Sequence, residues 1–190
     1  IDNAIDDIAP RRSVVVLGSG PLFDVPLESL ARTFETVWLV DRVHLSTIDK
    51  RIGRYDNVRR LWHDLNAATN PQPLRILRQI HDLDWVISVN LLSQLARAAT
   101  DQDRGIVVAT HLDELVDAGC PVTLVTDIDY RIIDRDGKVV EEGDLLHGKA
   151  MPKPDLTWKW EVAPVGEESP ETRRVHQVAA WLDWRRSSPR

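Results

Sequence analysis

Cysteine is nearly absent from this chain. Cys120 is the only one, so an internal disulfide cannot form. It stands between a predicted helix and a predicted strand, where a small buried thiol is common, and it has no neighbouring histidine as part of a catalytic signature. The histidines show no metal-like spacing to one another or to the cysteine, so we predict no metal site. We expect a cytoplasmic protein.

Long apolar runs and excess positive charge are also missing. No run approaches the ~20 residues that a helix needs to cross a bilayer, so we expect no membrane segment. Residues 1–7 are acidic, unlike a secretory signal or a transit peptide, and the lack of an initiator Met would fit a trimmed chain. The formal net charge is −6, which argues against a nucleic-acid partner because phosphate binding requires a basic face. A homodimer is one assembly that the sequence leaves open.

Apolar runs alternate with helical patterns through the first two thirds of the chain, and 190 residues suit a single domain. Predicted strands cover residues 13–17, 36–40, 57–62, 85–89 and 122–126. Predicted helices cover residues 25–34, 44–54, 73–80, 91–95 and 105–118, with Asp24 as a candidate N-cap of the first. This alternation predicts an α/β fold, with a doubly wound, mainly parallel sheet flanked by helices.

The pattern changes after Asp127. Residues 130–133 and 138–140 predict an antiparallel hairpin that turns at Asp136-Gly137. A loop over 143–156, a strand over 157–163 and a closing helix over 171–186 are expected to follow. We therefore predict one domain over 1–190, with a cofactor-binding core at 13–128 and antiparallel strands plus a closing helix at 129–190.

Tryptophans are concentrated in the last part of the chain. Trp158 and Trp160 alternate along the predicted strand, so they share one face. Trp181 and Trp184 would share one side of the predicted helix. One interpretation is that this helix packs on that strand. The other is that the tryptophans form an aromatic wall for an apolar or cationic substrate, or a partner interface.

A glycine turn and an acid follow the first two predicted strands. Gly18-Ser19-Gly20 lets the backbone turn tightly and approach a ligand, and the next helix offers free N–H groups. Asp41 ends the second strand, 23 residues after Gly18, where a carboxylate can accept hydrogen bonds from ribose hydroxyls. The alternative is an ordinary strand-to-helix turn that binds nothing.

Polar residues also follow the third and fourth strands. Asp64 could accept a hydrogen bond from an adenine amino group, or it could be a loop acid or helix cap. Ser88 and Asn90 stand where open α/β sheets bind ligands, outside the carboxyl ends of the strands. Together with the glycine turn, these residues predict one nucleoside-binding crevice.

In this order, the segments 14–20, 39–41, 63–64 and 84–95 resemble the class I S-adenosylmethionine-dependent methyltransferases. The resemblance implies S-adenosylmethionine as cofactor. It implies that the loop of Gly18, Ser19 and Gly20 carries the methionine end, that Asp41 holds the ribose and that Asp64 contacts the adenine. It also implies that the segment after the fourth strand lines the active site, and that the sheet ends with one reversed strand.

The sequence departs from that family at two positions. Val16 stands where the family usually has an acid, for which Asp24 could compensate, and Leu22 stands where a third glycine is common. These departures keep a non-catalytic binding or scaffold protein open as an alternative. An NAD-dependent oxidoreductase with Asp41 on the ribose is a third reading, although Phe23 breaks the Gly-x-Gly-x-x-Gly pattern.

The substrate is predicted to be a small molecule. Asn90 is followed by Leu91-Leu92, so the Asn-Pro-Pro-Tyr signature of amino-group methyltransferases on nucleic acids is missing. A sulfonium is already an activated methyl donor, so the protein mainly aligns the reactants and excludes water. No catalytic residue is identified. If a base is used, the candidates are His111, Asp127 and His147, with a surface, turn-capping or solvated residue as the respective alternative.

Overall fold

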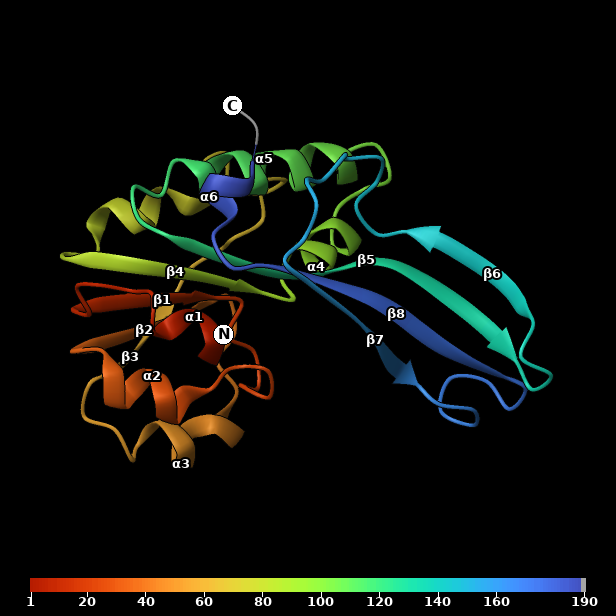
Figure 1. The fold of residues 1–190 in the computed structure, drawn as a ribbon, viewed down its shortest axis with the longest axis horizontal. Coiled ribbons are helices and arrows are strands. Elements are labelled where there is room, and N and C mark those ends of the chain that lie inside the picture. The colour runs from red at the N-terminus through yellow and green to blue at the C-terminus, as the bar shows by residue number, and fades with distance from the viewer. Residues whose placement is uncertain (189–190) are drawn as a thin grey trace.

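The computed structural model describes residues 1–188 as one mixed sheet with helices on both faces (Figure 1). The strands are β1 (Ser13–Leu17), β2 (Thr36–Asp41), β3 (Val58–Trp62), β4 (Leu83–Val89), β5 (Val122–Asp134), β6 (Val139–Asp144), β7 (Leu156–Ala163) and β8 (Thr172–Trp181). The helices are α1 (Asp2–Ile5), α2 (Leu27–Thr33), η1 (Ser46–Ile48), α3 (Asp49–Ile52), η2 (Pro73–Gln79), α4 (Leu92–Arg97), α5 (Arg104–Val116) and α6 (Trp184–Ser187).

The strand order is β3-β2-β1-β4-β5-β8-β7, and β6 pairs with β5. The pairs β1–β2, β1–β4, β2–β3 and β4–β5 are parallel, whereas β8 runs antiparallel to both β5 and β7. This confirms the predicted doubly wound, mainly parallel sheet with an antiparallel C-terminal part.

Two apolar layers sandwich the parallel strands. One contains α1, α2 and α3 with the β1, β2 and β4 residues that face them, and the other contains η2, α4, α5 and α6. Figure 1 shows these groups on opposite sides of the sheet. Every residue of β1 is buried, as expected for a strand covered on both faces. Within residues 1–188, no helix combines the length and the apolar character needed to span a bilayer.

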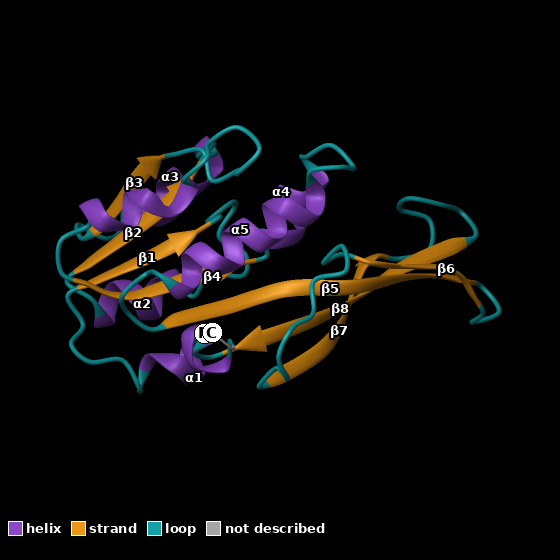
Figure 2. Cartoon of the chain, turned by 90° about the horizontal axis from the view of Figure 1, so that it is seen from above, coloured by secondary structure: helices purple, strands orange, loops and turns teal. Residues whose placement is uncertain are grey.

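Strand β5 belongs to two parts of the molecule. Residues 122–127 are buried between β4 and β8, whereas the rest of the strand extends outward with β6, β7 and β8 as an antiparallel ribbon (Figure 2). The β5–β6 hairpin closes through a hydrogen bond from the Gly137 N–H to the Asp134 carbonyl (3.1 Å), and Gly137 has a φ of 85°. The predicted Asp136-Gly137 turn is thereby confirmed.

The predicted closing helix over 171–186 is wrong. Residues 172–181 form β8, which lies between β5 and β7, and only 184–187 are helical. Helical spacing of apolar residues suggested the helix, but Val178 to Trp181 are all buried because this end of β8 is covered on both faces. A strand buried on both faces loses its alternation, so the pattern gave no sign of β8. Asp24 is not the cap of α2 either, since Pro26 occupies the N-cap position without a side-chain hydrogen bond.

Trp181 and Trp184 consequently pack on α5 and not on the strand of Trp158 and Trp160. Their rings meet edge to face with centroids 5.5 Å apart, and both side chains are buried. The Trp184 indole donates to the Leu112 carbonyl in α5 (3.2 Å). These two tryptophans therefore fasten the C-terminal segment to the core, and the predicted helix-on-strand packing is wrong.

A buried hydroxyl joins three segments of this core. Thr123 Oγ1 accepts a hydrogen bond from the Trp85 indole (3.1 Å) and donates one to the Leu182 carbonyl (2.8 Å), with both side chains fully buried. In Thr123→Val the indole N–H and the carbonyl lose their partner, which should cost about 1–3 kcal/mol of unfolding free energy. Urea denaturation measures this loss. Thr157→Val, at an exposed site, should change stability by less than about 0.5 kcal/mol; equal effects of both substitutions would contradict the account.

Candidate functional site

The glycine turn and Asp41 meet at the carboxyl edge of the parallel strands. Asp41 Oδ2 accepts a hydrogen bond from the Gly20 N–H at 2.9 Å, and Oδ1 accepts one from the Val43 N–H at 3.2 Å. Strands β1 and β2 pair in register up to Leu17 and Val40, so both loops leave the sheet at the same level. The carboxylate thus faces the turn, and each of its oxygens keeps a free lone pair for a further donor.

The two glycines of the turn differ in what surrounds them. Gly18 has a φ of 73°, and a Cβ on it would lie 2.9 Å from the Leu91 Cβ, so the segment after β4 packs directly on it. Gly20, with a φ of 47°, has only the Gly18 carbonyl oxygen near such a Cβ, at 4.0 Å. The open side of the turn is therefore at Gly20, beside Asp41, while Leu91 covers the side at Gly18.

The two departures from the methyltransferase pattern have structural reasons. Val16 is completely buried in the β1 core, where an acid would be surrounded by apolar side chains. Leu22 has a φ of 64°, in the left-handed region that favours glycine, and its side chain is completely buried. Position 22 keeps a glycine-like backbone while the leucine fills the core. Asp24 Oδ2 accepts a hydrogen bond from Asn90 Nδ2 at 2.9 Å.

Asp64 organises its own loop. Its Oδ1 accepts from the Asn66 N–H (3.1 Å) and its Oδ2 from the Thr69 hydroxyl (2.7 Å). Burial by itself raises the pKa of Asp64, but these hydrogen bonds, with the charges of Arg42 and His63, lower that pKa overall. The carboxylate thus has the geometry of a loop acid.

Ser88 and His111 lie inside the core, beneath the carboxyl edge. Ser88 is fully buried on β4, and its hydroxyl lies 3.0 Å from the His111 Nε2 in α5. Complete burial lowers the pKa of His111 to about 4. The imidazole is therefore a neutral core residue. His147 is exposed, in the turn after β6, with a φ of 51°.

Asp127, at the end of the parallel part of β5, lies in a polar cluster. Its Oδ2 accepts from the Ser93 hydroxyl at 3.2 Å and lies 3.2 Å from His176 Nδ1. Asp127 and His176 are both largely buried. Sequence reasoning missed His176 because it fell within the expected helix; a strand at that position would have placed it beside β5. The two groups are close enough to form an ion pair when His176 is protonated, although no hydrogen bond reaches Nδ1 among the described residues.

A cavity of about 320 Å³ opens at the same edge. It is lined by Ile1, Asp24, Val89, Asn90, Val125, Trp158, Trp160 and Val178. Asp127 and His176 do not line this cavity, but their strand partners do, because Asp127 pairs with Val178 and His176 pairs with Trp160. His176 lines a separate cavity of about 340 Å³ in the ribbon. Directly opposed residues of antiparallel strands project to the same face.

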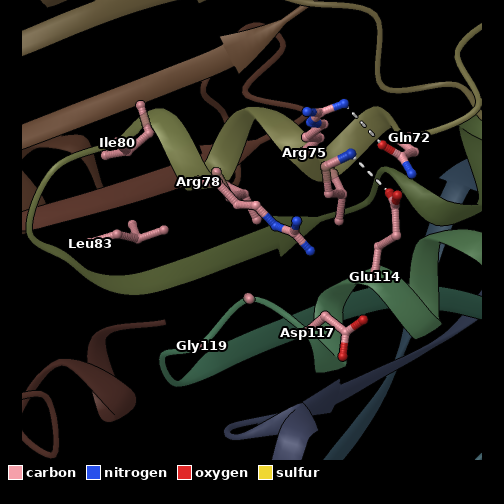
Figure 3. A pocket seen from close by; sticks show the side chains of 11 residues that line it. Gln72, Arg75, Arg78, Ile80, Leu83, Glu114, Asp117 and Gly119 are labelled. Carbon is pink, nitrogen blue, oxygen red and sulfur yellow. Dashed lines mark hydrogen bonds between the residues drawn. The ribbon is translucent and has the colours of Figure 1, made fainter.

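Two further cavities lie at the amino edge of the sheet. One, of about 430 Å³, lies between η2 and the end of α5 (Figure 3). There the Leu74 N–H donates to Glu114 Oε2 at 2.9 Å, and burial raises the pKa of Glu114. The other, of about 480 Å³, includes Ser13 and Thr36, the first residues of β1 and β2. Both cavities therefore lie at the edge of the sheet opposite to the glycine turn. Among residues 1–188, no group of three His, Cys, Asp or Glu side chains could hold a metal ion.

No model of a known family matches this sequence, and no curated protein matches it. Solved structures with a similar fold include an rRNA methylase from Streptococcus thermophilus (10% identity, 95% of this chain and 93% of that one, TM-score 0.46). They also include a precorrin-6y C5,15-methyltransferase from Geobacter metallireducens (12% identity, 95% of this chain and 86% of that one, TM-score 0.45). A third is a 1,6-didemethyltoxoflavin-N1-methyltransferase from Burkholderia thailandensis, crystallised with S-adenosylhomocysteine (14% identity, 95% of this chain and 77% of that one, TM-score 0.44). The likeness concerns the arrangement of elements, not individual residues.

The backbone at Leu22 predicts an inverted order of substitutions. Leu22→Ala removes a buried side chain, at about 2–5 kcal/mol, and keeps a left-handed non-glycine residue that costs about 1–2 kcal/mol. Leu22→Gly removes the same side chain but relieves that cost, so it should be at least as stable as Leu22→Ala in chemical denaturation. At Leu30, buried in α2, the order should be the usual one, with glycine less stable than alanine by about 1 kcal/mol. The same order at both positions would contradict the backbone assignment.

Buried His111 predicts a pH dependence of stability. The unfolded side chain binds a proton near pH 6.5, whereas the folded one does so only near its pKa of about 4. Unfolding therefore takes up a proton between these values, and the stability contributed by His111 is complete above pH 6.5 and is lost as pH falls toward 4. The stability difference between the natural chain and His111→Leu should shift by about 2 kcal/mol between pH 8 and pH 5, in favour of the variant. A pH-independent difference would show that His111 is not buried neutral.

Proposed function

We propose that this protein transfers a methyl group from S-adenosylmethionine to a small molecule at the carboxyl edge of its sheet. The observation that carries the proposal is the contact between Asp41 and the glycine turn, 2.9 Å from Oδ2 to the Gly20 nitrogen. A carboxylate beside a glycine bend, on neighbouring parallel strands, fits an adenosine ribose. The bound S-adenosylhomocysteine of the toxoflavin methyltransferase is in line with this cofactor.

The residues around the turn fit such a cofactor in part. Ribose hydroxyls would donate to the free lone pairs of Asp41, and the absent side chain of Gly20 leaves room for their approach. The Ser19 hydroxyl is one of eight buried side-chain polar atoms without a hydrogen-bond partner among the described residues, and a cofactor at the turn would supply that partner. Asp64 would accept a hydrogen bond from the adenine amino group with a lone pair that its own loop does not use. Asn90 would flank the site, whereas Ser88 is bonded to His111 inside the core.

The reacting methyl needs little help from the protein, because a bound sulfonium supplies an activated donor. The chain's own residues would orient the acceptor and take its proton. Asp127 is the only one of the three base candidates from the sequence that lies in a polar cluster beside the edge cavity, and it would act through His176. His176 Nε2 would accept the proton, and the Asp127 carboxylate, 3.2 Å from Nδ1, would stabilise the charged ring.

A small-molecule acceptor agrees with the net charge of −6, since nucleic-acid binding needs a basic face. The similar folds include both an rRNA methylase and enzymes titled for small molecules. Therefore the charge, and not the fold, supports the small molecule.

A non-catalytic binding protein is the second candidate, and one observation favours it. Leu91 occupies the space that a Cβ on Gly18 would need, so the first glycine serves internal packing whether or not a cofactor binds. A protein that kept the fold and lost methyl transfer could retain this arrangement.

Calorimetric titration separates these functions. Methyl transfer predicts micromolar binding of S-adenosylmethionine and S-adenosylhomocysteine and no comparable binding of NAD. Asp41→Ala should weaken both sulfur nucleosides at least tenfold, because the ribose loses its acceptor. Asp56→Asn, an exposed acid outside the site, should leave binding unchanged. Binding of NAD alone would point to an oxidoreductase, and no binding of any of these nucleotides would contradict the proposed cofactor.

A further inference from the structure

The edge cavity combines two exposed indoles with an unpaired carboxylate. Trp158 and Trp160 are 43% and 41% exposed, whereas Trp85, Trp181 and Trp184 are buried. They stand two residues apart on the edge strand β7 and line the same cavity as Asp24. Trp181 and Trp184, by contrast, are buried with their indole N–H groups bonded to carbonyls. Packing therefore accounts for Trp181 and Trp184, whereas Trp158 and Trp160 are accessible to a ligand.

The polar side chains of the cavity are those of Asp24 and Asn90. Asp24 Oδ2 accepts from Asn90 Nδ2 at 2.9 Å, which fixes the carboxylate across the gap between the loops after β1 and β4. Among the side chains of residues 1–188, no Lys, Arg or His forms an ion pair with Asp24. On the neighbouring strands, by contrast, Glu161 pairs with Arg173 at 3.3 Å.

We propose that this cavity binds a small organic ammonium ion, held by the indole faces of Trp158 and Trp160 and by the carboxylate of Asp24. Aromatic faces attract cations through the ring quadrupole, and the effect grows as the cation loses water. The floor of Val89, Val125 and Val178 suits the carbon part of such a ligand. A volume of about 320 Å³ matches the lower end of small-molecule pockets.

The binding of an ammonium ion to this cavity is independent of the proposed function. Its further role as the methyl acceptor rests on that function. A primary ammonium must first lose a proton, for which the His176 imidazole beside Trp160 is placed. The freed nitrogen lone pair then forms the N–C bond as the methyl–sulfur bond breaks. The products are an N-methylammonium and S-adenosylhomocysteine, and the proton on His176 returns to water.

Choline and its neutral carbon analogue, 3,3-dimethylbutan-1-ol, form a matched pair of probes that differ only in charge. Titration followed by ¹H–¹⁵N spectra of the indole N–H groups, assigned with Trp158→Phe and Trp160→Phe, reports directly on the cavity. We expect choline to shift these two signals and to bind at least tenfold more tightly than the analogue. The advantage should shrink at high salt, because the charge of Asp24 is screened.

Variants test each wall of the cavity. Asp24→Asn keeps a hydrogen-bond acceptor for Asn90 and should abolish most of the preference for choline, whereas Asp136→Asn in the β5–β6 turn should not. Trp160→Ala should weaken choline at least tenfold. Trp62→Ala, at another exposed tryptophan on β3 (60% exposed), should have no effect. If Trp160→Ala does not fold, the comparison of choline with its neutral analogue in Asp24→Asn still tests the ammonium site.

The outcomes separate this inference from the proposed function. Equal binding of choline and its analogue, or an unchanged preference in Asp24→Asn, overturns the ammonium site even if S-adenosylmethionine binds. A choline preference that depends on Asp24, without binding of sulfur nucleosides, supports the ammonium site and refutes the proposed methyl transfer. When both bind, labelled S-adenosylmethionine with phenethylamine should yield the N-methyl product; its absence overturns the assignment of an amine acceptor.

Discussion

The hydrogen bond from the Gly20 N–H to Asp41 is the interaction on which the functional account depends. It exists because β1 and β2 are parallel neighbours in register, so that the loops after them leave the sheet together. The carboxylate both closes the glycine turn and presents its remaining lone pairs at the carboxyl edge. The adjoining loops extend the same edge, since Asn90 after β4 holds Asp24 after β1. A polar rim is thereby assembled from segments that are distant in sequence.

The parallel half of the fold could be predicted from the sequence because its signals are local. Runs such as 13–17 and 36–40 are apolar throughout, and glycine turns and helical spacing separate them. The C-terminal half depends on partners that the sequence does not show. β8 is a strand because β5 and β7 supply hydrogen bonds on both of its sides. Its buried end, from Val178 to Trp181, has no alternation, and its apolar spacing also fits a helix, so the local pattern favoured the wrong element.

The residues of the candidate site also differ in whether local sequence patterns could locate them. Asp41 could be placed beside the turn, because an acid at the end of a strand next to a glycine turn follows from strand order alone. His176 could not be found, since its contact with Asp127 requires the β5–β8 register. Ser88 was expected at the edge and His111 was a candidate base, but α5 covers the end of β4, and the Ser88 hydroxyl lies against His111 Nε2 inside the core. At Leu22, burial of a large side chain outweighs a backbone angle that favours glycine.

The central claim is that a nucleoside binds at the carboxyl edge, against the turn that Asp41 closes. The most direct measurement is a backbone ¹H–¹⁵N titration with S-adenosylhomocysteine, in which the Gly20 amide reports on its bond to Asp41. The account predicts saturable shifts at Gly20 and Val43, the two amides that Asp41 accepts from. Unchanged Gly20 and Val43 signals, or shifts confined to the amino-edge cavities around Arg75 and Gln79, would contradict it.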